Sequence, residues 1–138
     1  MQNLAPLLNT ILFHHREWFE SKGNSGFYAD LSEEFLQREC FAGATLVEAN
    51  FQGAILDHAN FKCADLRGAN FYDAILTGAN FQGSNLEESD LMWADLKGAC
   101  LDGTRLDGAY LQGADLRETN ITQAQLNSAY IDEDTLIS

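Results

Sequence analysis

A five-residue repeat runs through most of this chain and constrains its fold more than any other feature. From residue 41 onward, every fifth residue is Leu, Phe or Ile. The residue two positions before each of these is Ala, Ser or Thr throughout residues 44–129. A repeat of fixed period decides the architecture before local helix or strand preferences do. The sequence therefore predicts a stack of equivalent short units.

A period of five matches neither the helix period of 3.6 residues nor the strand period of two. It suits a chain that turns a corner every five residues, with the large residue and the small residue pointing inward. Gly recurs two positions after the large residue, where a tight turn with positive φ favours it. These glycines are Gly43, Gly53, Gly68, Gly78, Gly83, Gly98, Gly103, Gly108 and Gly113. The pattern predicts a tube whose sides are joined by tight turns.

The units resemble the A(D/N)LXX signature of the pentapeptide-repeat proteins. The resemblance covers about residues 40–136, roughly 70% of the chain, in units such as 64–68 (Ala-Asp-Leu-Arg-Gly) and 69–73 (Ala-Asn-Phe-Tyr-Asp). It implies an all-β fold, a right-handed quadrilateral parallel β-helix with four units, or twenty residues, in each coil. The eighteen regular large residues at positions 46–131 then make about 4.5–5 coils, roughly 22 Å tall at the spacing of paired strands.

In such a coil, the large residues become core centres that stack along the four sides. Phenylalanines fall on two opposite sides in the first coils and give way to Leu and Ile later. The small residues face the same core, where a larger side chain would overpack it. The core centres singled out on this basis are Phe51, Phe61, Phe71, Phe81, Leu86, Leu96 and Leu106.

The first forty residues lie outside the regular array. Residues 3–22 are expected to form a helix with one apolar face, with Asn3 as its N-cap, which would serve as a lid on the first coil. Residues 29–40 keep the register, but Glu34 and Glu39 occupy positions that elsewhere hold small residues. A short helix over residues 31–38 or an irregular lead-in coil is expected there. The predicted division is a cap at 1–40 and a β-helix at 41–138.

Charge limits the classes of partner. The chain has 21 acidic and 8 basic residues, a formal net charge of −13. Nucleic acid and anionic lipid both select a basic surface, so neither is an expected partner. No segment approaches the roughly 20 apolar residues that span a bilayer. The absence of a signal-like N-terminus and the odd count of cysteines predict a reducing, cytoplasmic location.

No catalytic constellation is visible in the sequence. The histidines are His14 and His15 on the expected helix and His58 in the array, and no residue set has the spacing of a zinc site. The glycines recur at corners rather than in a phosphate-binding loop. The sequence therefore predicts a protein that is not an enzyme and has no metal and no cofactor.

One side of the tube carries the large exterior residues. Register places them beside the centres Phe51 and Phe71, and aromatic residues and Met are enriched at protein interfaces. The candidate partner-binding face consists of Tyr72, Met92, Trp93, Tyr110 and Tyr130. Ordinary solvent-exposed stacking is the alternative interpretation. At the C-terminal end, Leu136 and Ile137 form an apolar patch that can pair two subunits end to end.

Two functions remain open on the sequence alone. The first is a structural or protein-interaction module that presents flat β-helix faces to a protein partner. The second follows from the quinolone-resistance members of the family that the chain resembles, which mimic DNA and bind gyrase. The net charge of −13 is compatible with this acidic DNA mimic, whereas the short array and the lack of a visible C-terminal dimerisation helix are not.

Overall fold

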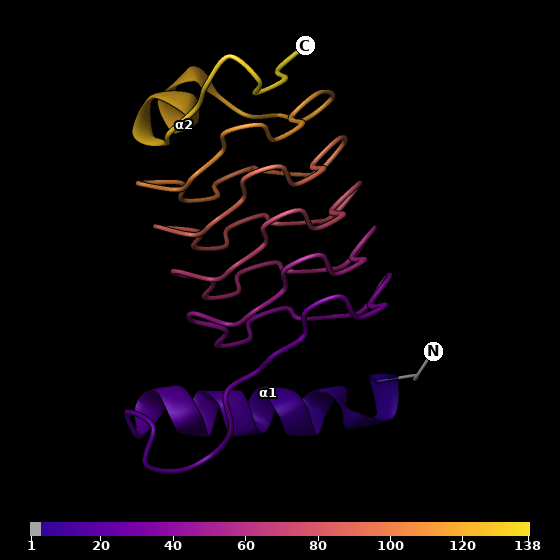
Figure 1. Ribbon diagram of the computed structural model, residues 1–138, viewed down its shortest axis with the longest axis vertical. Helices are drawn as coiled ribbons and strands as arrows, with labels where there is room; N and C mark the ends of the chain where they lie inside the picture. Colours follow the sequence, from indigo (N-terminus) through magenta and orange to yellow (C-terminus); the bar gives the residue numbers. More distant parts are fainter. Residues whose placement is uncertain (1–3) are drawn as a thin grey trace.

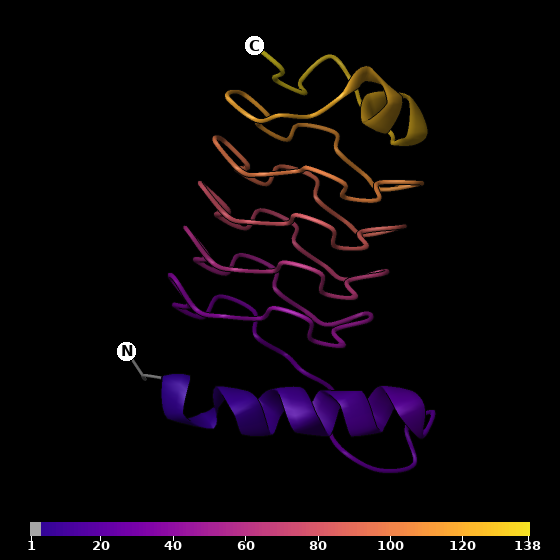
Figure 2. The same ribbon diagram turned by 180° about the vertical axis from the view of Figure 1, so that it is seen from behind.

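The structure, a computed structural model, describes residues 4–138 and consists of a tube of stacked coils between two helices. Helix α1 (Ala5–Glu20) lies across the N-terminal end of the tube, and helix α2 (Gln123–Ser128) lies at the opposite end, next to the C-terminus (Figure 1). The view from behind shows the same order, with α1, the coils and α2 as successive layers (Figure 2).

Parallel bridges between residues twenty apart define the coils. They form four ladders, one for each side of the tube. The first side contains Asp30, Asn50, Asn70, Asp90, Tyr110 and Tyr130, and the second contains Phe35, Ile55, Ile75, Asp95 and Asp115. The third contains Cys40, Asn60, Asn80 and Cys100, and the fourth contains Thr45, Asp65, Asn85 and Arg105. The expected twenty-residue, four-sided coil is confirmed by this register.

Each corner is a tight turn closed by the backbone. The amide of the residue three positions after a core centre donates to the carbonyl of that centre, as in Ala54 N–H to Phe51 O at 3.0 Å. The third turn residue has positive φ at every regular corner, whether it is Gly53 (φ 67°) or Trp93 (φ 61°), as type II turns require. Gly adopts this conformation without strain, which explains its recurrence at these positions.

Where an Asp or Asn precedes a buried centre, its side chain holds the following turn. Its side-chain oxygen accepts the amide of the residue two positions on, as in Asn70 Oδ1 from Tyr72 N–H at 2.9 Å and Asp90 Oδ1 from Met92 N–H at 3.0 Å. Short polar side chains commonly bond their own backbone two residues on. We find no side-chain hydrogen bond between Asn50 and Asn70 within residues 4–138, so their bridge pairing does not produce an amide ladder.

Eighteen consecutive centres, from Leu31 to Leu116, are buried. Phe41, Phe61 and Phe81 stack in one column with ring centroids 4.7 and 5.0 Å apart, and Phe51 stacks on Phe71 at 4.8 Å. The two columns meet edge to face, a favourable geometry for aromatic rings. All seven core centres singled out from the sequence, from Phe51 to Leu106, are fully buried or nearly so.

The regular coil begins earlier than the sequence suggested. The short helix expected over residues 31–38 is wrong, because Asp30, Phe35 and Cys40 bridge the next coil, and Leu31 and Leu36 are buried centres. The ladders thus cross the expected boundary at residue 40. Glu34 and Glu39, which argued against this coil, are only partly buried. They lie in the first coil, and their partial exposure means that their carboxylates are not enclosed.

Helix α1 closes this first coil as the predicted lid. Leu4 and Leu8 are buried against the core, and Ile11 and Leu12 pack beside them. The helix begins at Ala5, two residues after the start of the expected range, with Leu4 as N-cap and no side-chain cap bond. The expected N-cap Asn3 lies outside the described residues. Gly26 ends the connecting loop, and a Cβ there would meet the His14 carbonyl.

His15 fixes α1 to the coil beneath it. Its side chain is fully buried, and its Nδ1 accepts a hydrogen bond from the Ala29 amide at 2.9 Å. The ring proton is therefore on Nε2, which donates to the Val47 carbonyl at 2.8 Å. Burial lowers the pKa of His15, although the Val47 carbonyl and the Glu48 carboxylate oppose this effect. The neutral imidazole is thus the form that the fold selects.

The C-terminal end departs from the repeat. Residues 121–131 were expected to continue it, but Ile121 is only partly buried and Ile131 is 44% exposed. Helix α2 replaces this part of the coil, and Thr122 and Gln125 form its capping box. The side-chain Nε2 of Gln125 also donates hydrogen bonds to the backbone carbonyls of Leu101 and Thr104, at 2.7 and 2.9 Å. This helix therefore satisfies carbonyls at the open edge of the tube.

Candidate protein-interaction surface

The five residues predicted to bind a partner all lie on the first side of the tube, and we call them the aromatic face: Tyr72, Met92, Trp93, Tyr110 and Tyr130. Trp93, Tyr110 and Tyr130 are 49%, 41% and 54% exposed, whereas Tyr72 and Met92 are half-buried. The Tyr110 and Tyr130 rings stack with centroids 5.2 Å apart. The register therefore collects these residues over three successive coils, from 70 to 130.

The Trp93 indole packs on the next coil, in the space left by the missing side chain of Gly113. It occupies a corner, and a Cβ on Gly113 would lie 2.5–2.8 Å from three atoms of its indole ring. The indole therefore rests over the Gly113 backbone, where no other residue would fit. Corner side chains lean on a glycine of the next coil elsewhere too, as His58 does on Gly78. At Trp93 the result is a large apolar group in a fixed position that stays half exposed.

The carboxylates near the aromatic face belong to the turns. Asp90 accepts the Met92 amide, and Asp132 accepts the amides of Gly113 at 3.1 Å and Asp134 at 3.0 Å. Among residues 4–138, neither of them pairs with a Lys or Arg side chain. The aromatic face is thus bordered by negative charge that the protein itself does not neutralise.

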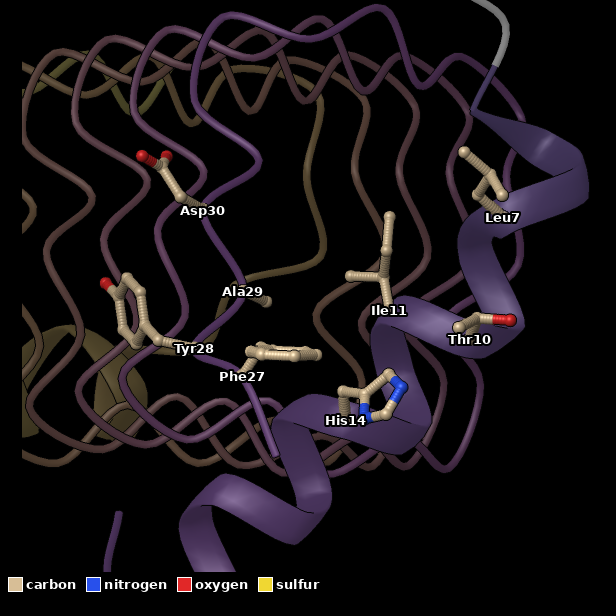
Figure 3. A pocket seen from close by; sticks show the side chains of 8 residues that line it. All are labelled: Leu7, Thr10, Ile11, His14, Phe27, Tyr28, Ala29 and Asp30. Carbon is tan, nitrogen blue, oxygen red and sulfur yellow. The ribbon is translucent and has the colours of Figure 1, made fainter. Parts of the chain in front are cut away.

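A separate pocket of about 360 Å³ lies where α1 meets the start of the first coil. Leu7, Ile11 and His14 line it from the helix, and Phe27 faces them from the connecting segment (Figure 3). Asp30 stands at the far side of the same view. The wall is mostly apolar, so the pocket suits a hydrophobic group.

Two titratable groups of this pocket, Asp30 and Tyr28, are poorly suited to acid–base chemistry. Ser32 donates two hydrogen bonds to the Asp30 carboxylate and Asn50 donates a third, which lowers the pKa of Asp30. Burial raises the pKa of Tyr28. Both pKa values move away from neutrality, whereas general acid–base groups work best near it. No group of three potential metal ligands occurs in the described part of the chain.

The three cysteines lie apart on the surface. Cys40 and Cys63 are exposed, Cys100 is partly buried, and all three are free thiols. Cys40 and Cys100 hold ladder positions of the third side normally taken by Asp or Asn, and each is near the amide nitrogen of the Asn in the next coil. Their positions give them structural neighbours rather than a shared site.

Sequence reasoning missed one exposed apolar ladder. Phe35, Ile55 and Ile75 stack on the second side, where Phe35 is 47% and Ile75 is 39% exposed. The sequence does contain the pattern of this ladder, because the three residues lie twenty positions apart and each directly precedes a core centre. The array was expected to begin after Phe35, so its alignment with the two isoleucines was not considered.

Comparison with known proteins agrees with this architecture. The sequence profile of the family described as Pentapeptide repeats matches residues 41–73, 74–113 and 101–131, in 8 copies. The chain therefore belongs to the pentapeptide-repeat family. Among proteins with curated descriptions, no sequence matches the chain.

Solved structures of this family resemble the chain to different degrees. The pentapeptide repeat protein alr5209 from Nostoc Pcc 7120 is 22% identical, with a TM-score of 0.67 over 85% of this chain and 92% of its own. A pentapeptide repeat protein from the Arabidopsis thaliana thylakoid lumen is 33% identical over 69% of this chain and 73% of its own, with a TM-score of 0.46. QnrB1, a plasmid-mediated fluoroquinolone resistance protein, is 20% identical over 76% of this chain and 61% of its own, with a TM-score of 0.48.

The length and hydrophobicity of the helices were compared with those of a membrane-spanning segment. Within residues 4–138, no helix combines the length and the apolar character needed to cross a membrane.

Proposed function

We propose that this protein is a non-enzymatic interaction module that presents the aromatic face to a protein partner. The observation that carries the proposal is the exposure of Trp93, Tyr110 and Tyr130 on one side of a regular tube. Large amphipathic rings dominate the binding energy of many protein interfaces. A module of this kind needs neither a cofactor nor a metal.

The scaffold supports this role because it holds the face rigid. The backbone of Tyr110 forms β-bridges with Asp90 in the preceding coil and with Tyr130 in the following coil, and the Trp93 indole packs on Gly113. Side chains that are already ordered lose less conformational entropy when a partner binds. A flat and preorganised surface is therefore available without rearrangement of the backbone.

Affinity capture from a lysate tests the proposal. Partners retained by the unaltered protein should be lost when Trp93→Ala and Tyr110→Ala are introduced together. Phe35→Ala is the matched control, because Phe35 is a similarly exposed aromatic residue on the second side. Equal retention by the double variant would contradict the proposal, and loss with Phe35→Ala alone would transfer the function to the second side.

An acidic DNA mimic that binds a DNA-handling protein such as gyrase is the second candidate. The formal net charge of −13 favours it. Ion pairs weaken it on the other sides, where Arg105 contacts Glu87 at 2.8 Å and Arg117 contacts Asp115 at 2.7 Å. A gyrase supercoiling assay separates the two candidates. Inhibition at micromolar protein supports the mimic, and an unchanged supercoiling rate removes it.

We also propose that the C-terminal end is the contact surface if the protein forms a homodimer. Ile131, Leu136 and Ile137 are each more than 40% exposed there. Light scattering of the unaltered protein and of Leu136→Asp tests the dimer. A monomeric mass for both proteins would exclude it.

We further propose a reducing compartment such as the cytoplasm, which the three free thiols fit.

A further inference from the structure

The first side of the tube carries no positive charge. Its outward positions are residues 30, 32 and 33 and every twentieth residue after each of them. None of these is Lys, Arg or His, and six are acidic: Asp30, Glu33, Asp73, Asp90, Asp132 and Glu133. The other three sides carry six of the chain's eight basic residues, and the remaining two belong to α1 and the loop after it.

The charges on the second and fourth sides are partly compensated, unlike those of the first side. Asp65 pairs with Arg67 at 2.7 Å, Arg105 with Glu87, and Asp115 with Arg117. No ion pair within residues 4–138 involves the acidic residues of the first side. Arginine side chains thus neutralise part of the negative charge on the other sides, whereas the negative charge beside the aromatic face is not neutralised.

Carboxylates and rings alternate at the centre of this side. Asp90 lies directly below Tyr110 in the same ladder, about 4.8 Å away along the tube. Asp73 occupies the corner below Trp93 in the same way, one coil earlier. The Trp93 indole covers Gly113 and remains 49% exposed, and Tyr110 is 41% exposed. The register therefore places each of the two carboxylates one coil spacing from a partly exposed ring.

We propose that the aromatic face binds an extended, arginine- or lysine-bearing segment of its protein partner, whose cationic groups contact these rings and carboxylates from the solvent side. A cation gains from the face of an aromatic ring and from a nearby carboxylate at once. An acidic segment would face six uncompensated carboxylates, so it is selected against. The inference rests on the proposed interaction function and adds the chemistry of the partner.

The shape of the surface favours an extended segment rather than a helix or a folded domain. The outward residues of the first side form straight columns along the tube, with no loop inserted between residues 30 and 119. The distance from Asp73 to Tyr130 spans about three coil spacings, roughly 14 Å. An extended chain covers this distance in about five residues. A short peptide can therefore contact both carboxylates and all three exposed rings.

Peptide titration tests the chemistry directly. The probe is a capped octapeptide of alternating Arg and Ser, titrated into the 138-residue chain by calorimetry at low salt. The comparison probe replaces each Arg by citrulline, which keeps the shape and removes the charge. We expect binding of the first peptide, little or none of the second, and weaker binding as salt rises.

Chain variants then locate the site. Asp73→Asn with Asp90→Asn removes two charges and keeps the fold, because Asn occupies the Asp90 ladder position in two earlier coils and tolerates positive φ at residue 73. Trp93→Leu removes the ring and keeps an apolar side chain. Each change should weaken binding of the arginine peptide by about tenfold, a typical effect of a partly desolvated cation–π or charge contact.

The matched control is Asp57→Asn with Asp102→Asn, which makes the same change in net charge on the second and third sides. Equal weakening by this control would show attraction to overall charge and would overturn the proposed site. Binding of the citrulline peptide as tight as that of the arginine peptide would overturn the cationic chemistry. If captured partners depend on Trp93 and Tyr110 but not on Asp73 and Asp90, the interaction function stands and this inference fails.

Discussion

The two halves of the tube are filled and closed by different means. In the N-terminal half, five stacked phenylalanines fill the core, and the sixteen-residue α1 closes the end with its apolar face and a buried His15. In the C-terminal half the centres are aliphatic, and the six-residue α2 buries only Leu126. Ile131, Leu136 and Ile137 stay exposed beside it. The same repeat therefore supports two ends of unequal strength.

This difference implies unequal local stability along the tube. In a stack, each coil depends on its neighbours, so a weakly covered end opens before the middle does. Most of the aromatic face belongs to the second half, since all of its residues except Tyr72 lie beyond the last phenylalanine. The proposed binding surface thus lies toward the end that is expected to open first. Partner binding should protect that end from opening.

One substitution placed in both regions should give the largest contrast. Leu86→Lys puts a charge in the closed middle of the core, where Leu86 is fully buried, and should abolish cooperative folding. Leu126→Lys in α2 lets the amine reach solvent, since Leu126 is 8% exposed, at a cost of about 1–2 kcal/mol. Circular dichroism melting curves measure both. Similar melting of the two variants would contradict the contrast between middle and end.

On the same side of the tube, the aromatic centres should contribute more to the free energy of unfolding than the aliphatic centres do. Phe61→Ala removes a ring stacked between Phe41 and Phe81 and should reduce the free energy of unfolding by about 3–5 kcal/mol. Leu101→Ala changes the same column one coil beyond the last ring, and about 2–3 kcal/mol is expected. Urea unfolding of both variants provides the comparison. A larger loss at Leu101 would reverse the assignment of the stronger half.

The N-terminal end should weaken in acid because of His15. Its folded pKa is lowered from 6.5, so the unfolded chain takes up a proton at a higher pH than the folded chain does. The stabilisation is complete above about pH 6.5 and is lost as the pH falls toward the folded pKa. Protonation would also place an N–H at Nδ1 against the Ala29 amide.

Differential unfolding measurements isolate this effect from the titration of the carboxylates. His15→Gln should cost about 1–3 kcal/mol at neutral pH, because buried backbone groups lose their partner, and the difference from the unaltered protein should shrink below about pH 6. His14→Gln is the control on the same helix. A constant difference between His15→Gln and the unaltered protein from pH 5 to 8 would refute the role of the neutral imidazole.

The smallest effect is expected at the C-terminal closure. Gln125→Ala removes the donor to the Leu101 and Thr104 carbonyls and one half of the capping box, at a cost of about 1 kcal/mol. Hydrogen exchange should accelerate at residues 108–130 and stay unchanged at residues 29–50. Faster exchange at both ends would mean that the halves open as one unit.

The repeated part of this fold could be predicted almost completely from the sequence. The period of five predicts a tube that turns a corner every five residues, and the resemblance to the pentapeptide-repeat proteins implies four units in each coil. The Phe columns then follow from counting. The two ends could not be predicted as well. Glu34 and Glu39 indicated a break, although the first coil tolerates both carboxylates because they stay partly exposed. At the other end, the Thr122–Gln125 capping box signalled α2, but Leu126 and Ile131 kept the period and concealed it.

The sequence predicted where the residues of the candidate site lie, but only part of their packing and of the charge around them. Register alone placed Tyr72, Met92, Trp93, Tyr110 and Tyr130 on one side. The seating of Trp93 on Gly113 depends on how corner side chains lean toward the next coil, which a residue pattern does not specify. The absence of positive charge on the same side emerges only when every outward position is assigned to a ladder.

The twenty-residue pairing of the coils has a consequence for how this protein can change. An insertion of one five-residue unit between Asp90 and Arg105 would leave Leu and Ala facing inward, so the core would still close. Asp90 would then pair with Arg105, and Tyr110 and Tyr130 would move a quarter of the way around the tube. Folding is thus preserved by steps of five residues, whereas recognition is preserved only by steps of twenty.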